Sequence, residues 1–150
     1  MYKHILVAID SSSTSDRAFL EAIKLAKDQQ ATLRIVYAVD EANINTSPEF
    51  VNPTELVDAW AESGHAILDK AKNQALAAGV QAETQLIESE IIKLGVGIAD
   101  AIVAEAKAWP ADLLVIGTHG RTGLSHLLFG SVAEGIVRIC PVPILLIRAK

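Results

Sequence analysis

Several things are scarce in this chain of 150 residues, and each scarcity excludes a class of protein. It has a single cysteine, Cys140, which rules out an internal disulfide and fits a reducing compartment. Acidic residues outnumber basic ones by 18 to 13, the formal net charge is −5, and no basic stripe occurs, so nucleic-acid binding is not expected. No apolar run is long enough to span a membrane.

The chain also shows no secretory signal, no linker and no repeat. Its first apolar run, residues 5–9, is short and ends at Asp10, unlike the core of a signal peptide. With 51% apolar residues, 150 residues are enough for one domain with a sizeable core. We therefore expect one domain over residues 1–150, located in the cytoplasm, with no membrane partner.

Apolar strand patterns alternate with helical patterns along the whole chain. Strands are expected at residues 2–9, 32–39, 82–88, 112–116 and 144–148. Helices are expected in the segments between them, the last at residues 131–139, and residues 40–53 are expected to form a surface loop. Continuous apolar strands alternating with helices indicate an α/β fold, an open five-stranded parallel sheet with helices on both faces.

A glycine-rich segment lies between the fourth strand and the last helix, and it is the most informative part of the chain. It contains Gly117, Gly120 and Gly130, followed by Ser131. Glycines let the backbone approach an anion closely, and a helix start offers unpaired N–H groups with a partial positive charge. A strand, a glycine-rich loop and a helix start in this order predict a phosphate-binding site, with Val132 and Ala133 adding backbone N–H groups.

An acidic residue follows the first strand just as this segment follows the fourth. Asp10 stands at the carboxyl end of the first strand and Gly117 at that of the fourth. In open parallel sheets, ligands bind outside the carboxyl ends of strands, where the strand order reverses. If the two strands are neighbours, Asp10 and the glycine segment face one crevice.

The pattern Gly117-x2-Gly120-x9-Gly130-Ser131 resembles the ATP-binding signature of the universal stress protein family. Residues 4–11 are similar to the family's opening and residues 141–148 to its ending, so the likeness covers essentially the whole chain. The resemblance implies a Rossmann-like fold of strand order 3-2-1-4-5. It also implies ATP, or ADP or AMP, with Mg²⁺ or Mn²⁺, and a homodimer formed through the last strand, Ile144 to Arg148. An apolar edge strand without a partner would favour such pairing.

The resemblance assigns roles to particular residues, and each has a plainer alternative. Gly117, Gly120, Gly130 and Ser131 would bind phosphate and ribose, although Ser131 could instead be an ordinary N-cap. Asp10 and Ser11 would lie near ribose and metal, although Asp10 could simply cap a turn. The remaining expected contacts are Ala8 and Ile116 beside adenine, or in the core; Val39 through its backbone; and Arg121 at the terminal phosphates, or in solvent. His119 is expected to hydrogen-bond within the loop, and no set of metal ligands is recognisable.

Two functions remain open on this reading. The first is a nucleotide-dependent regulatory module of the stress response; the second is a slow ATPase or phosphotransferase. No Gly-Lys-Ser P-loop occurs, and Asp10 is the one candidate base, so at most weak hydrolysis is expected. A phosphoacceptor receiver domain is disfavoured because no late lysine accompanies the early aspartate. An ATP pyrophosphatase domain is disfavoured because the turn at residues 10–15 lacks glycine.

Overall fold

The computed structural model describes residues 1–38, 53–87, 97–119 and 130–148, and for residues 53–61 it describes the backbone alone. The strands are β1 (His4–Ile9), β2 (Thr32–Ala38), β3 (Ala82–Ile87), β4 (Leu113–Gly117) and β5 (Ile144–Ile147). The helices are α1 (Ser13–Gln29), α2 (Pro53–Ala77), α4 (Ile98–Ala108) and α5 (Ser131–Ile139). No helix in these ranges has the length and hydropathy of a membrane span.

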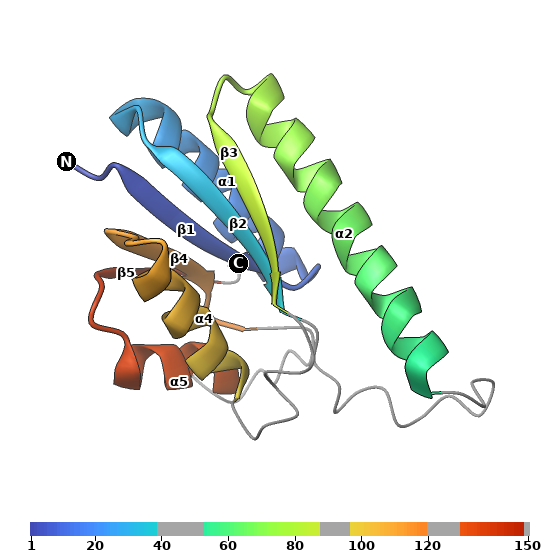
Figure 1. The fold of residues 1–150 in the computed structure, drawn as a ribbon. Helices are drawn as coiled ribbons and strands as arrows, with labels where there is room; N and C mark the ends of the chain where they lie inside the picture. The colour runs from blue at the N-terminus through green and yellow to red at the C-terminus, as the bar shows by residue number, and fades with distance from the viewer. Residues whose placement is uncertain (39–52, 88–96, 120–129, 149–150) are drawn as a thin grey trace.

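The strands form a single parallel sheet of order β3-β2-β1-β4-β5 (Figure 1). β1 pairs with β2 from His4 opposite Thr32 onward, and with β4 from Ile5 opposite Leu113. The expected fold class and strand order are therefore confirmed. The strand order reverses between β1 and β4, because β2 and β3 lie on one side of β1 and β4 and β5 lie on the other.

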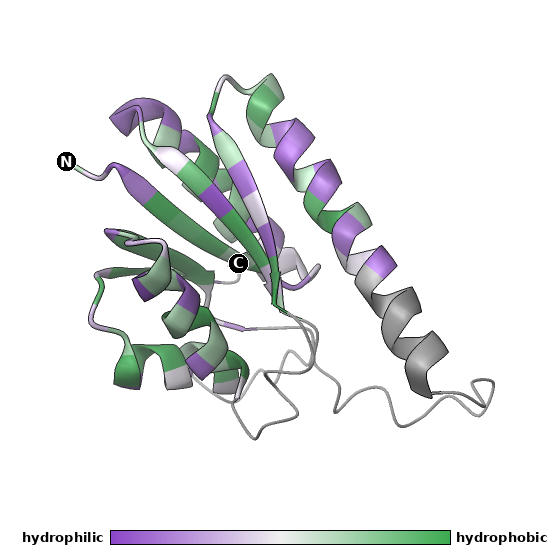
Figure 2. Cartoon of the chain, in the orientation of Figure 1, coloured by the Kyte–Doolittle hydropathy of each residue, from purple (hydrophilic) through white to green (hydrophobic). Residues whose placement is uncertain are grey.

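Helices cover both faces of the sheet, which explains the continuous apolar runs in the central strands, such as residues 5–9 of β1 and the whole of β4 (Figure 2). Ile5 and Val7 of β1 point toward α1 and α2, while Leu6 and Ala8 point toward α4 and α5. On the second face Ile136 of α5 is fully buried. Burying an isoleucine side chain contributes about 1.5–3 kcal/mol, so the apolar side of α5 holds this short helix on the sheet.

Small departures from the expected boundaries have local causes. The first strand begins at His4 rather than Tyr2, and the fourth at Leu113 rather than Asp112. Asp112 lies just before β4, and its carboxylate accepts backbone N–H bonds from Lys3 at 2.7 Å and His4 at 3.0 Å. These two side-chain bonds add to the backbone bond that the Asp112 N–H donates to the His4 carbonyl at 2.8 Å, just before the paired residues of β1 and β4. The expected loop at residues 40–53 lies almost entirely outside the described residues.

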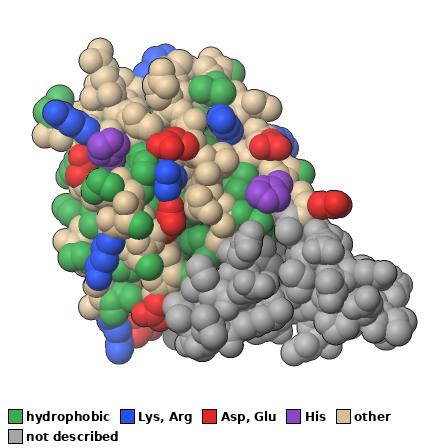
Figure 3. All heavy atoms as spheres, in the orientation of Figure 1, with side chains coloured by type: hydrophobic (Ala, Val, Ile, Leu, Met, Phe, Trp, Pro, Cys, Tyr) green, Lys and Arg blue, Asp and Glu red, His purple; other side chains and the backbone are tan. Residues whose placement is uncertain are grey.

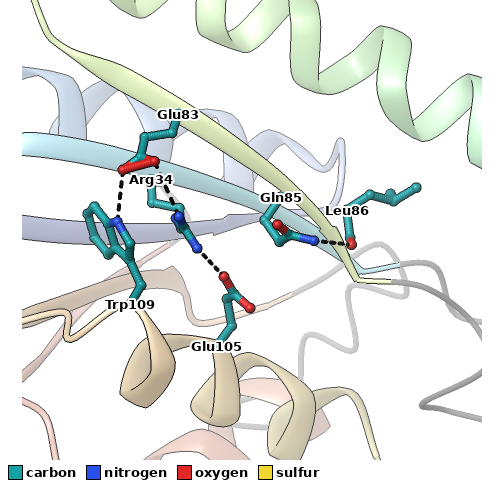
Figure 4. Close-up of polar contacts among 6 residues, drawn as sticks. All are labelled: Arg34, Glu83, Gln85, Leu86, Glu105 and Trp109. Atoms are coloured by element: carbon teal, nitrogen blue, oxygen red, sulfur yellow. Dashed lines mark hydrogen bonds and ion pairs between the residues drawn. The ribbon is translucent and has the colours of Figure 1, made fainter.

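A group of polar side chains covers the part of β2 and β3 next to the end of α4 (Figure 4). Arg34 pairs with Glu105 and, at 3.2 Å, with Glu83, whose carboxylate also accepts the Trp109 indole N–H at 2.8 Å. We call Arg34, Glu83, Glu105 and Trp109 the Arg34 cluster. Partial burial alone would raise the pKa of Glu83, but the hydrogen bonds from Trp109 and Arg34 outweigh it and hold that pKa below its ordinary value.

The molecular face seen in Figure 1 carries charges of both signs (Figure 3). Among the described residues, acidic and basic side chains lie interspersed there, with apolar side chains between them.

Candidate functional site

The carboxyl ends of β1 and β4 lie side by side at the point where the strand order reverses. β1 ends at Ile9, directly before Asp10, and β4 ends at Gly117. The topology thus places Asp10 and the start of the glycine-rich segment at one edge of the sheet, as the sequence predicts. This edge is where open parallel sheets bind their ligands.

The two ends of the glycine-rich segment are tied together by Thr118. Its carbonyl accepts the N–H of Gly130 at 2.6 Å, and its own N–H donates to the Ile147 carbonyl of β5 at 2.9 Å. Thr118 is only 2% exposed. The start of α5 is therefore held at the end of β4, beside β5. The role of Thr118 was not predicted from the sequence, although a polar residue directly after a buried strand is a signal for one.

The first turn of α5 has the backbone geometry of a helix start, and among the residues that the structure describes no side-chain cap bond is found there. Gly130 is the N-cap residue, with φ −68° and ψ 163°, and it makes no side-chain cap bond. Ser131 is therefore the first helical residue, and the plainer view of it as an N-cap is wrong. The N–H groups of Ser131, Val132 and Ala133 belong to the first turn, which has no intrahelical acceptors. Such groups, with the helix dipole behind them, attract an anion.

Gly117 lacks a side chain for a reason that the sequence did not reveal. A Cβ atom at this position would lie 2.7 Å from Cγ2 of Thr14 and 3.2 Å from the Thr14 backbone carbonyl carbon and oxygen. Thr14, in the first turn of α1, is itself buried. Gly117 therefore lets α1 pack closely against the end of β4, and this packing brings the α1 start to the same edge of the sheet.

The turn from β1 into α1 is closed by its own side chains. Asp10 Oδ1 accepts the Ser12 N–H at 2.9 Å, and the Asp10 N–H donates to Ser15 Oγ at 2.9 Å. Ser12 Oγ caps α1 by accepting the Ser15 N–H at 3.1 Å. Ser11 has a φ of +69°, in the left-handed region that serine seldom adopts. The turn-capping interpretation of Asp10 is thus confirmed, and the α1 start, unlike that of α5, has a side-chain cap.

The remaining expected contacts divide between the core and the segments that are not described. Ala8 is 8% exposed and Ile116 6%, and both pack in the core beneath α4 and α5, as their plainer interpretation predicts. Val39, Gly120 and Arg121 lie outside the described residues. His119 Nδ1 lies 3.0 Å from Thr118 Oγ1, in hydrogen-bond contact with its neighbour as predicted.

Within the described ranges no three His, Cys, Asp or Glu side chains gather into a metal cage. A Mg²⁺ ion that accompanies a nucleotide is usually held by phosphate oxygens, water and one or two carboxylates. Asp10 is the carboxylate that directly follows β1 at this edge, and a hydrogen bond to Ser12 occupies its Oδ1. The donor set therefore fits a metal ion that arrives with phosphate, and not a separate metal centre in these ranges.

Comparison of the sequence and the structure with those of known proteins shows which family the chain is similar to. The profile of the universal stress protein family matches residues 1–148. Universal stress protein YxiE of Bacillus subtilis is 35% identical over 157 aligned residues, covering 99% of this chain and all of that protein. The solved structure of hypothetical protein MJ0577 is 26% identical with a TM-score of 0.83, over 100% of this chain and 98% of that one. A universal stress protein solved in complex with cAMP is 30% identical with a TM-score of 0.66, over 98% and 97% of the two chains.

Proposed function

Since this chain belongs to the universal stress protein family, we propose that it binds ATP with Mg²⁺ or Mn²⁺ and acts as a nucleotide-dependent regulatory module of the stress response. The nucleotide would lie at the carboxyl ends of β1 and β4, with its phosphates at the start of α5. ADP or AMP would occupy the same place after hydrolysis or exchange. We place this activity in the cytoplasm.

The observation that carries the proposal is the start of α5, where Gly130 makes no side-chain cap bond and is held in place by its N–H bond to the Thr118 carbonyl. A phosphate group would supply the acceptors that the first-turn N–H groups lack, and its charge would be favoured by the helix dipole. Ser131 is exposed, so its hydroxyl can also donate to a phosphate oxygen. The cAMP complex of a relative that is 30% identical supports an adenine nucleotide as the ligand.

Slow turnover is part of the proposal. Phosphoryl transfer needs a metal clamp and a base or nucleophile in position. Asp10 is the candidate base at this edge, and its carboxylate is engaged in holding the turn into α1. We therefore propose hydrolysis slower than about 1 per second, the low end of ordinary enzymes.

We also propose that two copies pair along β5. The outermost strands of the sheet are β3 and β5. β3 carries Glu83, Thr84 and Gln85, polar residues that protect an edge, whereas β5 is Ile-Leu-Leu-Ile. Leu145 of β5 is 36% exposed, and Val137 of α5 is 46% exposed. Pairing with a second β5 would complete the ladder and shield apolar surface.

Calorimetric titration of nucleotide-stripped protein with Mg-ATP tests the proposed site through two matched variants. Gly130 and Gly97 are N-caps of α5 and α4 with nearly the same backbone angles, and neither has a side-chain cap. Asparagine is a good N-cap residue that such angles accommodate, so both variants should fold. We expect Gly130→Asn to weaken ATP binding at least about tenfold, because its side-chain amide would occupy the position proposed for the phosphate at the first turn of α5. Gly97→Asn should bind like the wild type.

Two results would contradict the proposal. If the folded wild-type chain takes up no Mg-ATP, the glycine-rich segment is not a nucleotide site, and an interaction module is the better interpretation. If Gly130→Asn binds as tightly as Gly97→Asn, the phosphates do not bind at α5. Saturation near one ATP per chain, lost in Gly130→Asn alone, would support it.

A further inference from the structure

The end of β5 is connected both to the proposed nucleotide site at α5 and to the proposed dimer edge. β5 has only four residues, Ile144–Ile147, and within the described chain it pairs with β4 alone. Its end is held by two contacts beyond the ladder. The Ile147 carbonyl accepts the Thr118 N–H at 2.9 Å, and the next carbonyl, that of Arg148, accepts a hydrogen bond from the Arg17 guanidinium of α1.

Thr118 joins this strand end to the start of α5. The carbonyl of this same residue accepts the Gly130 N–H at 2.6 Å. Gly130, Thr118 and Ile147 are thus linked by consecutive backbone hydrogen bonds, and the side chain of Thr118 is buried. A shift of the α5 start relative to β4 would strain one of these bonds, and so would a shift of the β5 end.

From this connection we infer that nucleotide binding at α5 and pairing of two copies along β5 strengthen each other through Thr118, with Arg17 as a positioning residue for the strand end. The inference rests on the proposed function, because it needs both the nucleotide and the second copy. The proposed nucleotide site at the start of α5 and the proposed dimer edge along β5 are separate, and the end of β5 is bonded to the first and belongs to the second.

The coupling would arise because the nucleotide and the second copy both order the same residues at the end of β5. A four-residue strand paired on one side is among the elements of a fold that open most easily. A phosphate at α5 would hold Gly130 and Thr118, and through them Ile147. A second β5 would order the same residues from the outer edge. Whichever partner binds first pays this ordering cost, so the second binds more tightly, and linkage requires the effect to be reciprocal.

The first measurement is the dimer dissociation constant by sedimentation velocity, with and without saturating Mg-ATP. Nucleotide occupancy is measured separately by equilibrium dialysis of the same samples. We expect Mg-ATP to lower the dimer dissociation constant at least about fivefold. Because coupling is reciprocal, a monomeric Leu145→Lys variant should bind ATP more weakly than the wild-type dimer by a comparable factor.

Two arginine variants test the path of the coupling. Arg17→Ala removes the contact to Arg148, whereas Arg138→Ala removes an exposed ion pair with Glu134 on α5. Because Arg17→Ala leaves the end of β5 less ordered, more of it remains for the nucleotide and the second copy to order, so the coupling should increase in Arg17→Ala and stay at the wild-type value in Arg138→Ala. Hydrogen exchange gives an independent readout: in Leu145→Lys, Mg-ATP should slow exchange of the Thr118 amide, and adding Arg17→Ala should speed that exchange in the nucleotide-free protein.

The outcomes separate the inference from the proposed function. If dialysis shows ATP bound and the dimer dissociation constant does not change, the coupling is refuted while the nucleotide site stands. If dialysis shows no ATP bound, the proposed function fails and the coupling fails with it. Absence of dimers at any concentration, or a coupling in Arg17→Ala weaker than in the wild type, would equally overturn the inference as stated.

Discussion

Replacing Gly117 with alanine tests whether this glycine of the motif serves packing. The added Cβ would lie 2.7 Å from Thr14 Cγ2, closer than carbon atoms approach without strain, and 3.2 Å from two Thr14 backbone atoms. Thr14 is 5% exposed and lies in the first turn of α1, so its methyl group cannot swing into solvent. Relief requires α1 to move away from the end of β4.

The expected cost follows from two opposing terms. Overpacking a buried contact costs about 1–3 kcal/mol. Gly117 is not among the residues with positive φ, so alanine also lowers the entropy of the unfolded chain and returns about 0.4–1 kcal/mol. We therefore expect Gly117→Ala to lower the free energy of unfolding by about 1–2 kcal/mol, measured by urea denaturation.

Thr14→Ser supplies the decisive control, because it removes the Cγ2 atom and leaves the hydroxyl. Alone it should destabilise slightly, by about 0.5–1.5 kcal/mol, as expected for a lost methyl group. Combined with Gly117→Ala it should relieve the 2.7 Å contact and leave the two 3.2 Å contacts. A double-mutant cycle should then show a favourable coupling of at least about 0.5 kcal/mol in the free energy of unfolding. Strictly additive effects would refute the packing explanation.

Substitutions at three further positions test other parts of the structure. Because the pKa of Glu83 is lowered in the fold, its stabilising contribution is present above its ordinary pKa of about 4.5 and lost as the pH falls through the folded value. The stability difference between wild type and Glu83→Gln, from urea unfolding at several pH values, should therefore shrink toward acid; a constant difference would contradict this. Ile136→Ala should cost about 2–5 kcal/mol in the same assay, since Ile136 is fully buried; a cost below about 1 kcal/mol would contradict its core role. Asp10→Asn keeps an acceptor for the Ser12 N–H and should unfold like the wild type, whereas Asp10→Ala should lose about 1 kcal/mol. Equal stability of the two Asp10 variants would show that this acceptor does not matter.

Much of the fold follows from local patterns in the sequence. The span of α5, Ser131–Ile139, agrees with the prediction at both ends, because a glycine stands before it and prolines follow it closely. The continuous apolar runs predicted strands covered on both faces, and the core clusters above and below the sheet confirm this. Patterns within a strand do not determine its neighbours. The strand order rested on the resemblance to a family, and the structure confirms it.

Features of the site that depend on contacts between distant residues could not be predicted. The close approach of Gly117 to Thr14 joins segments about a hundred residues apart, so the motif alone suggested a ligand as the reason for glycine. The role of Thr118 depends on β5, which contributes the Ile147 carbonyl. Asp112 likewise completes a ladder with residues at the opposite end of the chain. Such roles arise from tertiary packing, which leaves no periodic signal in a single sequence.

The starts of α1 and α5 lie at the same edge of the sheet but differ in how their first-turn N–H groups are satisfied. At α1, Ser12 and Asp10 satisfy backbone N–H groups, so an anion there would have to displace acceptors that the chain already provides. At α5, the N-cap is Gly130, and among the described residues no side-chain cap bond is found there. A phosphate that binds there need not break such a bond, whereas at α1 it would have to displace the caps of the serine-rich turn. On this physical ground we expect the phosphates of the proposed nucleotide at α5 and not at α1.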